Sequence, residues 1–244
     1  MYSFLISLAI ALIIGCGWAL LGLWETWAMG TWLGIAAFIA SWFIIGRIIK
    51  KRIEPAILHA QKQAESGKAQ LALQTFESLL PLGNWQPLLK GQLYAQMGIL
   101  CASTGDEQKG LEFLQKSSAR FADAQMFLAA MHARGGNPAK AVKVLENCEG
   151  YNKKHILLHN LHAYLLEKQD KRSEAIAVLN KLLKNEKSNE ITKDNLLRLQ
   201  NDKKLNMKRF GMTWYALQLE KPPAGMGQQR AARPGFRQKG KRRK

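Results

Sequence analysis

The chain has 244 residues, enough for one or two domains. It carries 36 Lys and Arg against 18 Asp and Glu, a net charge of +18, and 47% of its residues are hydrophobic. Neither property is spread evenly. Up to Gly46 the only charged side chain is Glu25, whereas residues 203–244 hold 13 basic side chains and one acid. This unevenness excludes a chain that is soluble along its whole length.

Two apolar stretches, 2–24 and 27–49, predict a pair of transmembrane helices. At 1.5 Å per residue, each is long enough to cross about 30 Å of hydrocarbon. The connection between them is very short, so residues 1–52 are predicted to form an antiparallel hairpin. Aromatic rings favour the membrane–water boundary, and the tryptophans near the turn are Trp18, Trp24, Trp27 and Trp32.

The placement of basic residues predicts the orientation of this hairpin. The turn has none, whereas four follow the second stretch directly: Arg47, Lys50, Lys51 and Arg52. Positive charge is retained on the cytoplasmic side of bacterial membranes. We therefore expect a multi-pass protein of the bacterial inner membrane with both termini in the cytoplasm.

Small residues recur within both apolar stretches, which allows membrane helices to approach closely. They are Ser7, Ala11, Gly15 and Ala19 in the first and Gly30 and Gly34 in the second. Such residues are also simply common in membrane helices, and this possibility stays open.

Two other interpretations of the start of the chain are less well supported. A cleaved secretory signal requires a positively charged first segment, and residues 1–5 contain no Lys or Arg. Residues 13–16 loosely resemble a bacterial lipobox ending at Cys16, but apolar sequence continues beyond this cysteine. The three cysteines (Cys16, Cys101 and Cys148) are an odd number for a disulfide framework, and reduced thiols agree with a cytoplasmic domain.

From Pro55 onward the pattern changes to amphipathic helices separated by short turns, and proline is suited to the first turn of a helix. One unit recurs four times: a turn residue, a polar stretch, a small residue and a bulky apolar residue four positions later. The turn residues are Gly67, Gly105, Gly136 and Asp170. The small and bulky residues are Ala72 and Phe76, Gly110 and Leu114, Ala141 and Leu145, and Ala175 and Leu179.

The small residues of successive units are 38, 31 and 34 positions apart, close to the 34-residue period of tetratricopeptide repeats. Region 53–205 therefore resembles the tetratricopeptide-repeat (TPR) family, with about four helix pairs and a capping helix from Ser188 to about Leu205. The sequence departs from the family at Cys101 and His132, where a tyrosine is usual. The resemblance implies an all-α solenoid whose paired helices pack at the small residues.

The resemblance also implies a concave surface that binds a peptide or helix. No phosphate-binding loop or nucleophile elbow occurs in the sequence, and we expect neither a catalytic site nor a cofactor. The predicted groove is apolar to neutral, which favours an apolar helix or extended segment as ligand. Its expected lining is Ala95, Ile99, Met126, Ala130, Asn160 and Tyr164. We therefore expect a membrane scaffold that recruits protein partners.

Three histidines, His155, His159 and His162, are spaced to share one face of a helix, with Cys148 just upstream. That spacing is compatible with a metal site. The segment lacks an obvious fourth ligand, and residues at this spacing also face the interior of a helix pair. We therefore favour packed histidines and expect no metal.

The end of the chain divides into an aromatic segment, 206–221, and a tail, 222–244, that is predicted to be disordered. The apolar side chains between Phe210 and Leu219 are too many to lie free in water. We expect this segment to dock on the last repeats near Tyr164, with contact to the membrane as the alternative.

The basic cluster of the tail suits several partners. It can bind anionic lipid, neutralise the phosphates of RNA or the ribosome, or simply keep the tail soluble. A membrane-tethered RNA- or ribosome-associated factor is therefore the alternative function. The cluster comprises Arg230, Arg233, Arg237, Lys239, Lys241, Arg242, Arg243 and Lys244.

Overall fold

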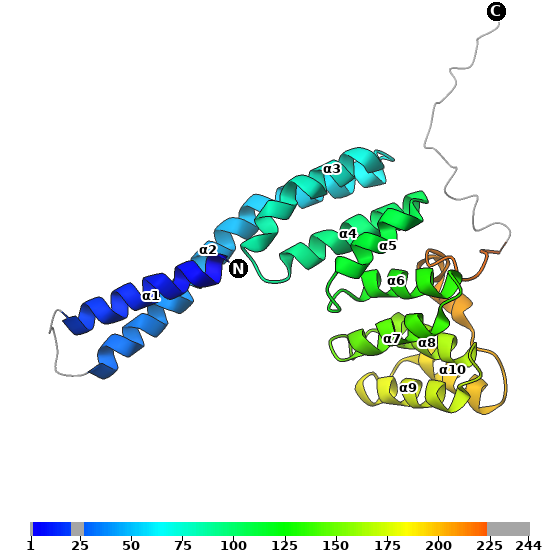
Figure 1. Ribbon diagram of the computed structural model, residues 1–244. Helices are drawn as coiled ribbons and strands as arrows, with labels where there is room; N and C mark the ends of the chain where they lie inside the picture. The colour runs from blue at the N-terminus through cyan, green and yellow to red at the C-terminus, as the bar shows by residue number, and fades with distance from the viewer. Residues whose placement is uncertain (1, 21–26, 224–244) are drawn as a thin grey trace, which may run out of the picture.

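The computed structural model describes residues 2–20 and 27–223, and within them every regular element is a helix. Figure 1 shows a long hairpin, coloured blue to cyan, that leads into a stack of shorter helix pairs. The predicted all-α class is confirmed, and the stacked pairs have the form of a TPR-like solenoid.

The hairpin consists of α1 (Tyr2–Leu20) and the first part of α2 (Trp27–Glu65), which lie side by side. Their backbones come close because the contact is made of small residues. A methyl carbon on Gly30 would lie 3.2 Å from the carbonyl oxygen of Gly15, and one on Gly34 would lie 3.2 Å from that of Ala11. The predicted packing through small residues is therefore present in the structure.

Within the described residues, one helix is long and apolar enough to cross a membrane. It is Met29–Glu65, with an 18-residue stretch of mean hydropathy 1.9 of which only 6% is buried. The apolar part of α1, Tyr2–Trp18, is shorter. The predicted turn at Glu25 and Thr26 lies outside the described residues.

Helix α2 runs without a break from the apolar stretch into the first repeat. The predicted boundary at residues 52–53 falls inside it, and Pro55 lies within the helix rather than at its start. Proline cannot donate the hydrogen bond that the carbonyl group of Lys51 would accept. Both residues are exposed, so water can reach that carbonyl and the helix continues.

Four antiparallel pairs make up the repeat domain: α2 with α3, α4 with α5, α6 with α7, and α8 with α9. Helix α10 (Glu190–Gln200) follows where a capping helix is expected, but it ends earlier than Leu205. The remaining helices are α3 (Ala69–Leu79), α4 (Leu89–Thr104), α5 (Glu107–Lys116), α6 (Ala122–Arg134), α7 (Pro138–Glu149), α8 (Ile156–Glu167) and α9 (Arg172–Asn185).

The turn inside each pair has the same conformation. The four turn residues have φ between 59° and 92°, and three of them are glycines. After each, a backbone N–H donates to the carbonyl group five positions earlier, as Asp106 does to Cys101 at 3.0 Å. This is the Schellman arrangement that ends a helix. The repeated turn signals in the sequence therefore mark equivalent helix ends.

The structure buries all of the predicted packing residues of the four pairs. Phe76 is 2% exposed, and the other bulky residues and all three alanines are 0% exposed. Gly110 is also buried, and a methyl carbon there would lie 3.1 Å from the backbone nitrogen of Ala102. A second glycine that the pattern did not reveal, Gly98, faces Leu114 across the same pair.

The connection from α3 to α4 ties the repeat domain to the hairpin. It begins with a 3₁₀ helix, η1 (Leu80–Asn84). Gln86 Nε2 donates to the carbonyl oxygen of Gly46 in α2 at 2.8 Å. Ser3 Oγ of α1 donates to the carbonyl oxygen of Trp85, whose ring meets that of Tyr2 at 5.7 Å.

Candidate functional site

Residues 205–221, named here the docked segment, fold back onto the repeats. The segment contains a 3₁₀ helix, η2 (Met207–Phe210), and the single-turn α11 (Met212–Tyr215). Trp214 is 0% exposed and meets the ring of Tyr164 edge-on at 4.9 Å between ring centroids. The expected docking near Tyr164 is what the structure shows.

Hydrogen bonds fix the docked segment against α6 and α8. Arg134 of α6 donates to the carbonyl oxygen of Leu217 at 2.8 Å. Glu220 accepts from Trp214 Nε1 at 3.2 Å and from the hydroxyl group of Tyr164 at 3.3 Å. Burial, helped by the Glu220 carboxylate, raises the pKa of Tyr164 to about 12. Tyr164 is therefore a neutral donor at physiological pH.

Helix α10 is joined to α8 by a buried network of amide side chains. Asn160 donates to Thr192 Oγ1 at 3.0 Å and accepts from Asn195 at 2.8 Å. Asn195 in turn accepts from the backbone N–H of Asn206, the second residue of the docked segment, at 2.8 Å. The side chains of Asn160, Thr192 and Asn195 are all 0% exposed. Asn160 therefore holds α10 against α8 and is not accessible to a binding partner.

The predicted groove of six residues does not form an open surface, and that prediction is wrong. Neighbouring first helices pack against each other, as α4 does on α6, and α10 and the docked segment cover α8. Small side chains on these helices therefore lie between pairs. Five of the six are buried and Ile99 is half-buried; the buried five are Ala95, Met126, Ala130, Asn160 and Tyr164.

An open groove remains between α2 and α4, named here the α2–α4 groove. Its volume is about 340 Å³. It starts next to the apolar part of α2 and combines aliphatic side chains with amides. Leu58, at 51% exposure, is its most exposed large apolar side chain. The lining residues are Lys50, Ile53, Glu54, Ile57, Leu58, Gln61, Gln86, Leu89 and Gln92.

The three histidines of α8 have three different partners. His155 Nδ1 accepts from the backbone N–H of Leu158 at 3.2 Å and caps the helix. His159 Nε2 donates to the carbonyl oxygen of Asn152 at 3.2 Å. His162 Nδ1 donates to the carboxylate of Glu149. His159 Nδ1 also lies 3.7 Å from the Glu149 carboxylate, so His159 and His162 approach one carboxylate, whereas His155 lies apart at the start of the helix.

Glu149 is the buried centre of this cluster. Burial disfavours its charged form, but hydrogen bonds from His162 and Lys181 outweigh that effect and hold the pKa of Glu149 at about 2. Burial also raises the pKa of the neighbouring Cys148 thiol to about 12, so it is neither a thiolate nor a reactive nucleophile at neutral pH. Throughout residues 2–20 and 27–223, no group of three or more His, Cys, Asp or Glu side chains is placed to hold a metal ion.

The basic cluster predicted to bind anionic lipid or nucleic acid, from Arg230 to Lys244, lies outside the described residues. Within the described part of the chain, Glu220, near the end of the docked segment, accepts a hydrogen bond from Tyr164 of α8.

These features define the class of the molecule: an all-helical, TPR-like repeat protein with one helix able to cross a membrane. No protein-family model matches the sequence, and no curated protein matches it. Among solved structures, the chain is similar to a crystal structure of MamA protein at 16% identity and a TM-score of 0.45. The similarity covers 74% of this chain and 92% of that one. The TPR-like class is assigned from the helix pairs described above and not from this similarity.

Proposed function

We propose that this chain is a non-enzymatic scaffold of the bacterial inner membrane that presents the α2–α4 groove to a protein partner. The observation that carries the proposal is the contrast between the two ends of the solenoid. At α8 the first-helix face is covered by α10 and the docked segment, whereas between α2 and α4 a groove is left open.

Both α1 and α2 cross the membrane in this proposal. The 19 residues of α1 span about 28 Å, close to the thickness of the hydrocarbon core. The two helices expose large apolar side chains outward, including Ile13 at 72%, Trp32 at 69% and Phe43 at 68%. A soluble protein would bury helices of this composition, so their exposed surfaces are suited to lipid.

The partner we propose is an apolar helix or extended segment that lies close to the membrane surface. The groove offers aliphatic contacts together with the amides of Gln61 and Gln92. Leu88, which is not in the groove lining but directly precedes the lining residue Leu89, is 43% exposed and has φ of 71°, a strained conformation for a large side chain. Strain of this kind is often retained where it serves binding.

Site-specific photocrosslinking in intact cells tests this proposal. A photoreactive amino acid at Leu58 should form a defined adduct with one membrane-associated protein, because that side chain is exposed inside the groove. Tyr151, which is 62% exposed in the loop between α7 and α8, provides the matched control position. Lack of an adduct at Leu58, or the same adducts at both positions, would overturn the proposed site.

A further inference from the structure

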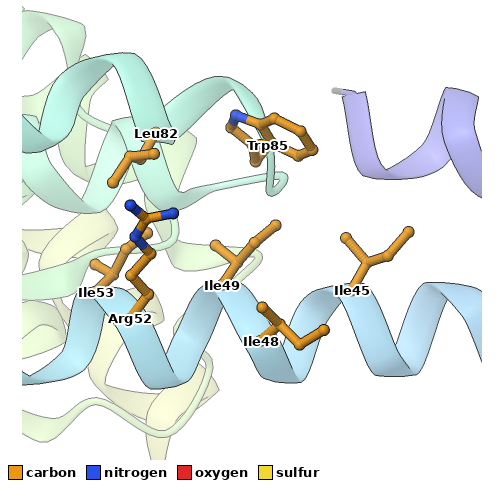
Figure 2. A pocket seen from close by; sticks show the side chains of 7 residues that line it. All are labelled: Ile45, Ile48, Ile49, Arg52, Ile53, Leu82 and Trp85. Atoms are coloured by element: carbon orange, nitrogen blue, oxygen red, sulfur yellow. The ribbon is translucent and has the colours of Figure 1, made fainter.

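A second pocket lies where α2 leaves its apolar stretch, between α2 and the connection that follows α3 (Figure 2). Its volume is about 280 Å³. Six of its seven lining side chains are hydrophobic, and the seventh is an arginine. They are Ile45, Ile48, Ile49, Arg52, Ile53, Leu82 and Trp85.

The polarity of the pocket changes along α2. Ile45 and Ile48 lie at the end that faces the apolar stretch, and Arg52 lies toward the repeat domain (Figure 2). Seven residues of helix separate Ile45 from Arg52, which is about 10 Å. A phospholipid in the inner leaflet has the same order, with its acyl chains in the hydrocarbon core and its phosphate on the cytoplasmic side.

Arg52 is available for a ligand. Its side chain is exposed, and among the described residues no carboxylate forms an ion pair with it. Three more basic residues flank it on the same turns of α2: Arg47, Lys50 and Lys51. The planar guanidinium group of arginine is well suited to two hydrogen bonds with one phosphate.

The wall opposite α2 is held in place before any ligand arrives. The side chain of Gln86, in the connection, donates a hydrogen bond to the carbonyl oxygen of Gly46 in α2. The hydroxyl group of Ser3 in α1 donates one to the carbonyl oxygen of Trp85. The ring of Tyr2 meets the edge of Trp85. Contacts from both α1 and α2 therefore hold Trp85 beside the pocket. Tryptophan side chains favour the membrane–water boundary, which is where the proposed anchor would place this residue.

We propose that this pocket binds one anionic phospholipid, with its phosphate on Arg52 and part of an acyl chain between the isoleucines and Trp85. The site rests on the membrane anchor of the proposed function. The apolar lining is suited to an acyl chain, because burial of its methylenes favours binding.

Native mass spectrometry of the full chain in mild detergent tests this site, because detergent removes the diffuse attraction of a charged membrane surface. The probe is phosphatidylglycerol, compared with phosphatidylcholine. The wild-type chain should retain one phosphatidylglycerol, and Arg52→Gln should weaken retention at least fivefold. Lys51→Gln removes the same charge from the preceding residue, which does not line the pocket, and should retain the lipid. Ile48→Trp should block the pocket without changing its charge.

The controls distinguish a defined lipid site from diffuse attraction by charge. Equal losses in Arg52→Gln and Lys51→Gln would show a diffuse charge effect and overturn the site. Equal retention of phosphatidylcholine would do the same. Displacement by free glycerol phosphate at the same concentration as the lipid would show that the acyl chain plays no part, and would also overturn the site.

The test also distinguishes this site from the proposed function. A chain recovered in the soluble fraction without detergent would overturn the membrane anchor and the lipid site together. A membrane-embedded chain on which Arg52→Gln has no effect would overturn the lipid site alone. Partner crosslinking at Leu58 is measured separately and is not decided by either result.

Discussion

Among the described glycines, Gly98 of α4 has the least room for a side chain, because it faces Leu114 of α5. A methyl carbon on Gly98 would lie 2.6 Å from Leu114 Cγ and 2.9 Å from its backbone nitrogen. The backbone cannot move aside as a flexible side chain can. This contact therefore sets the distance between the two helices of the second pair.

We expect Gly98→Ala to destabilise the protein by about 1–3 kcal/mol, the usual range for overpacking. Gly150→Ala is the matched control, because a methyl group there meets nothing within 4 Å and the backbone φ is −57°. It should be neutral or stabilising by up to about 1 kcal/mol. Urea unfolding of both variants, followed by circular dichroism, measures the difference. Equal stabilities would mean that α4 and α5 are farther apart than these distances require.

The Glu149 cluster makes stability depend on pH. Burial lowers the pKa of His159 below its ordinary 6.5, so the unfolded chain takes up a proton there before the folded one does. The pKa of Glu149 is lowered to about 2, and below its ordinary 4.5 the unfolded chain again binds more protons. Both groups therefore reduce the free energy of unfolding as the pH falls, His159 below about 6.5 and Glu149 from about 4.5 toward 2.

We expect His159→Gln to flatten the pH dependence of stability just below pH 6.5 and to leave the loss below pH 4.5 in place. The measurement is urea unfolding at a series of pH values. A profile unchanged by His159→Gln would show that His159 is protonated equally in the folded and unfolded chains.

The residues inside each helix pair were predictable, but the contacts between pairs were not. Ala141 and Leu145 belong to a local pattern that recurs along the chain, and both are 0% exposed. The Glu149 cluster depends on side chains from three helices, and the sequence contains no local signal for Lys181 as a partner. The predicted groove was wrong for the same reason, since the burial of Ala130 depends on the stacking of pairs.

At the scale of elements, the sequence predicts helix identity better than helix ends. Each turn contains a residue suited to positive φ, so the four pairs are recognisable. The continuity of α2 was missed because proline normally marks a helix start. Whether Pro55 interrupts a helix depends on whether the carbonyl group of Lys51 is exposed to water, which only the three-dimensional arrangement shows.

The docked segment should make a large contribution to stability. Trp214→Ala removes a side chain that is 0% exposed, and we expect a loss of about 3–5 kcal/mol. Met212→Ala, from the same turn, is the control, because Met212 is 48% exposed. Chemical unfolding of the full chain measures both. Similar, small losses would mean that Trp214 does not pack on Tyr164.

Fluorescence provides a second measurement of the docked segment. The difference in emission between the wild-type chain and Trp214→Phe isolates Trp214 from the other six tryptophans. Docking predicts a blue-shifted difference spectrum before any anionic lipid is added. An emission that shifts to the blue only with anionic vesicles would make the segment a membrane element instead.

For the whole molecule, the continuity of α2 couples the proposed membrane anchor to the repeats. Its 39 residues extend about 58 Å, roughly twice the thickness of the hydrocarbon core. The second half of α2, beyond its apolar stretch, forms the first helix of the first pair and one wall of the α2–α4 groove. The proposed anchor would therefore hold this groove at a fixed height and direction relative to the membrane surface.

Topology provides the last prediction, and it tests the anchor as a whole. Both termini should be cytoplasmic, because Arg47, Lys50, Lys51 and Arg52 follow the second apolar stretch and the predicted turn has no basic residue. In a Cys16→Ser background, Thr26→Cys should react with an impermeant thiol reagent from outside the inner membrane. Leu58→Cys, which is exposed in the groove, should react only after permeabilisation, and a reporter fused after Lys244 should be active in the cytoplasm. Labelling of both cysteines from outside would place the repeat domain outside the membrane and would overturn the predicted orientation. Labelling of neither position until permeabilisation, with the reporter still active, would mean that the hairpin does not cross the bilayer and would overturn the proposed anchor.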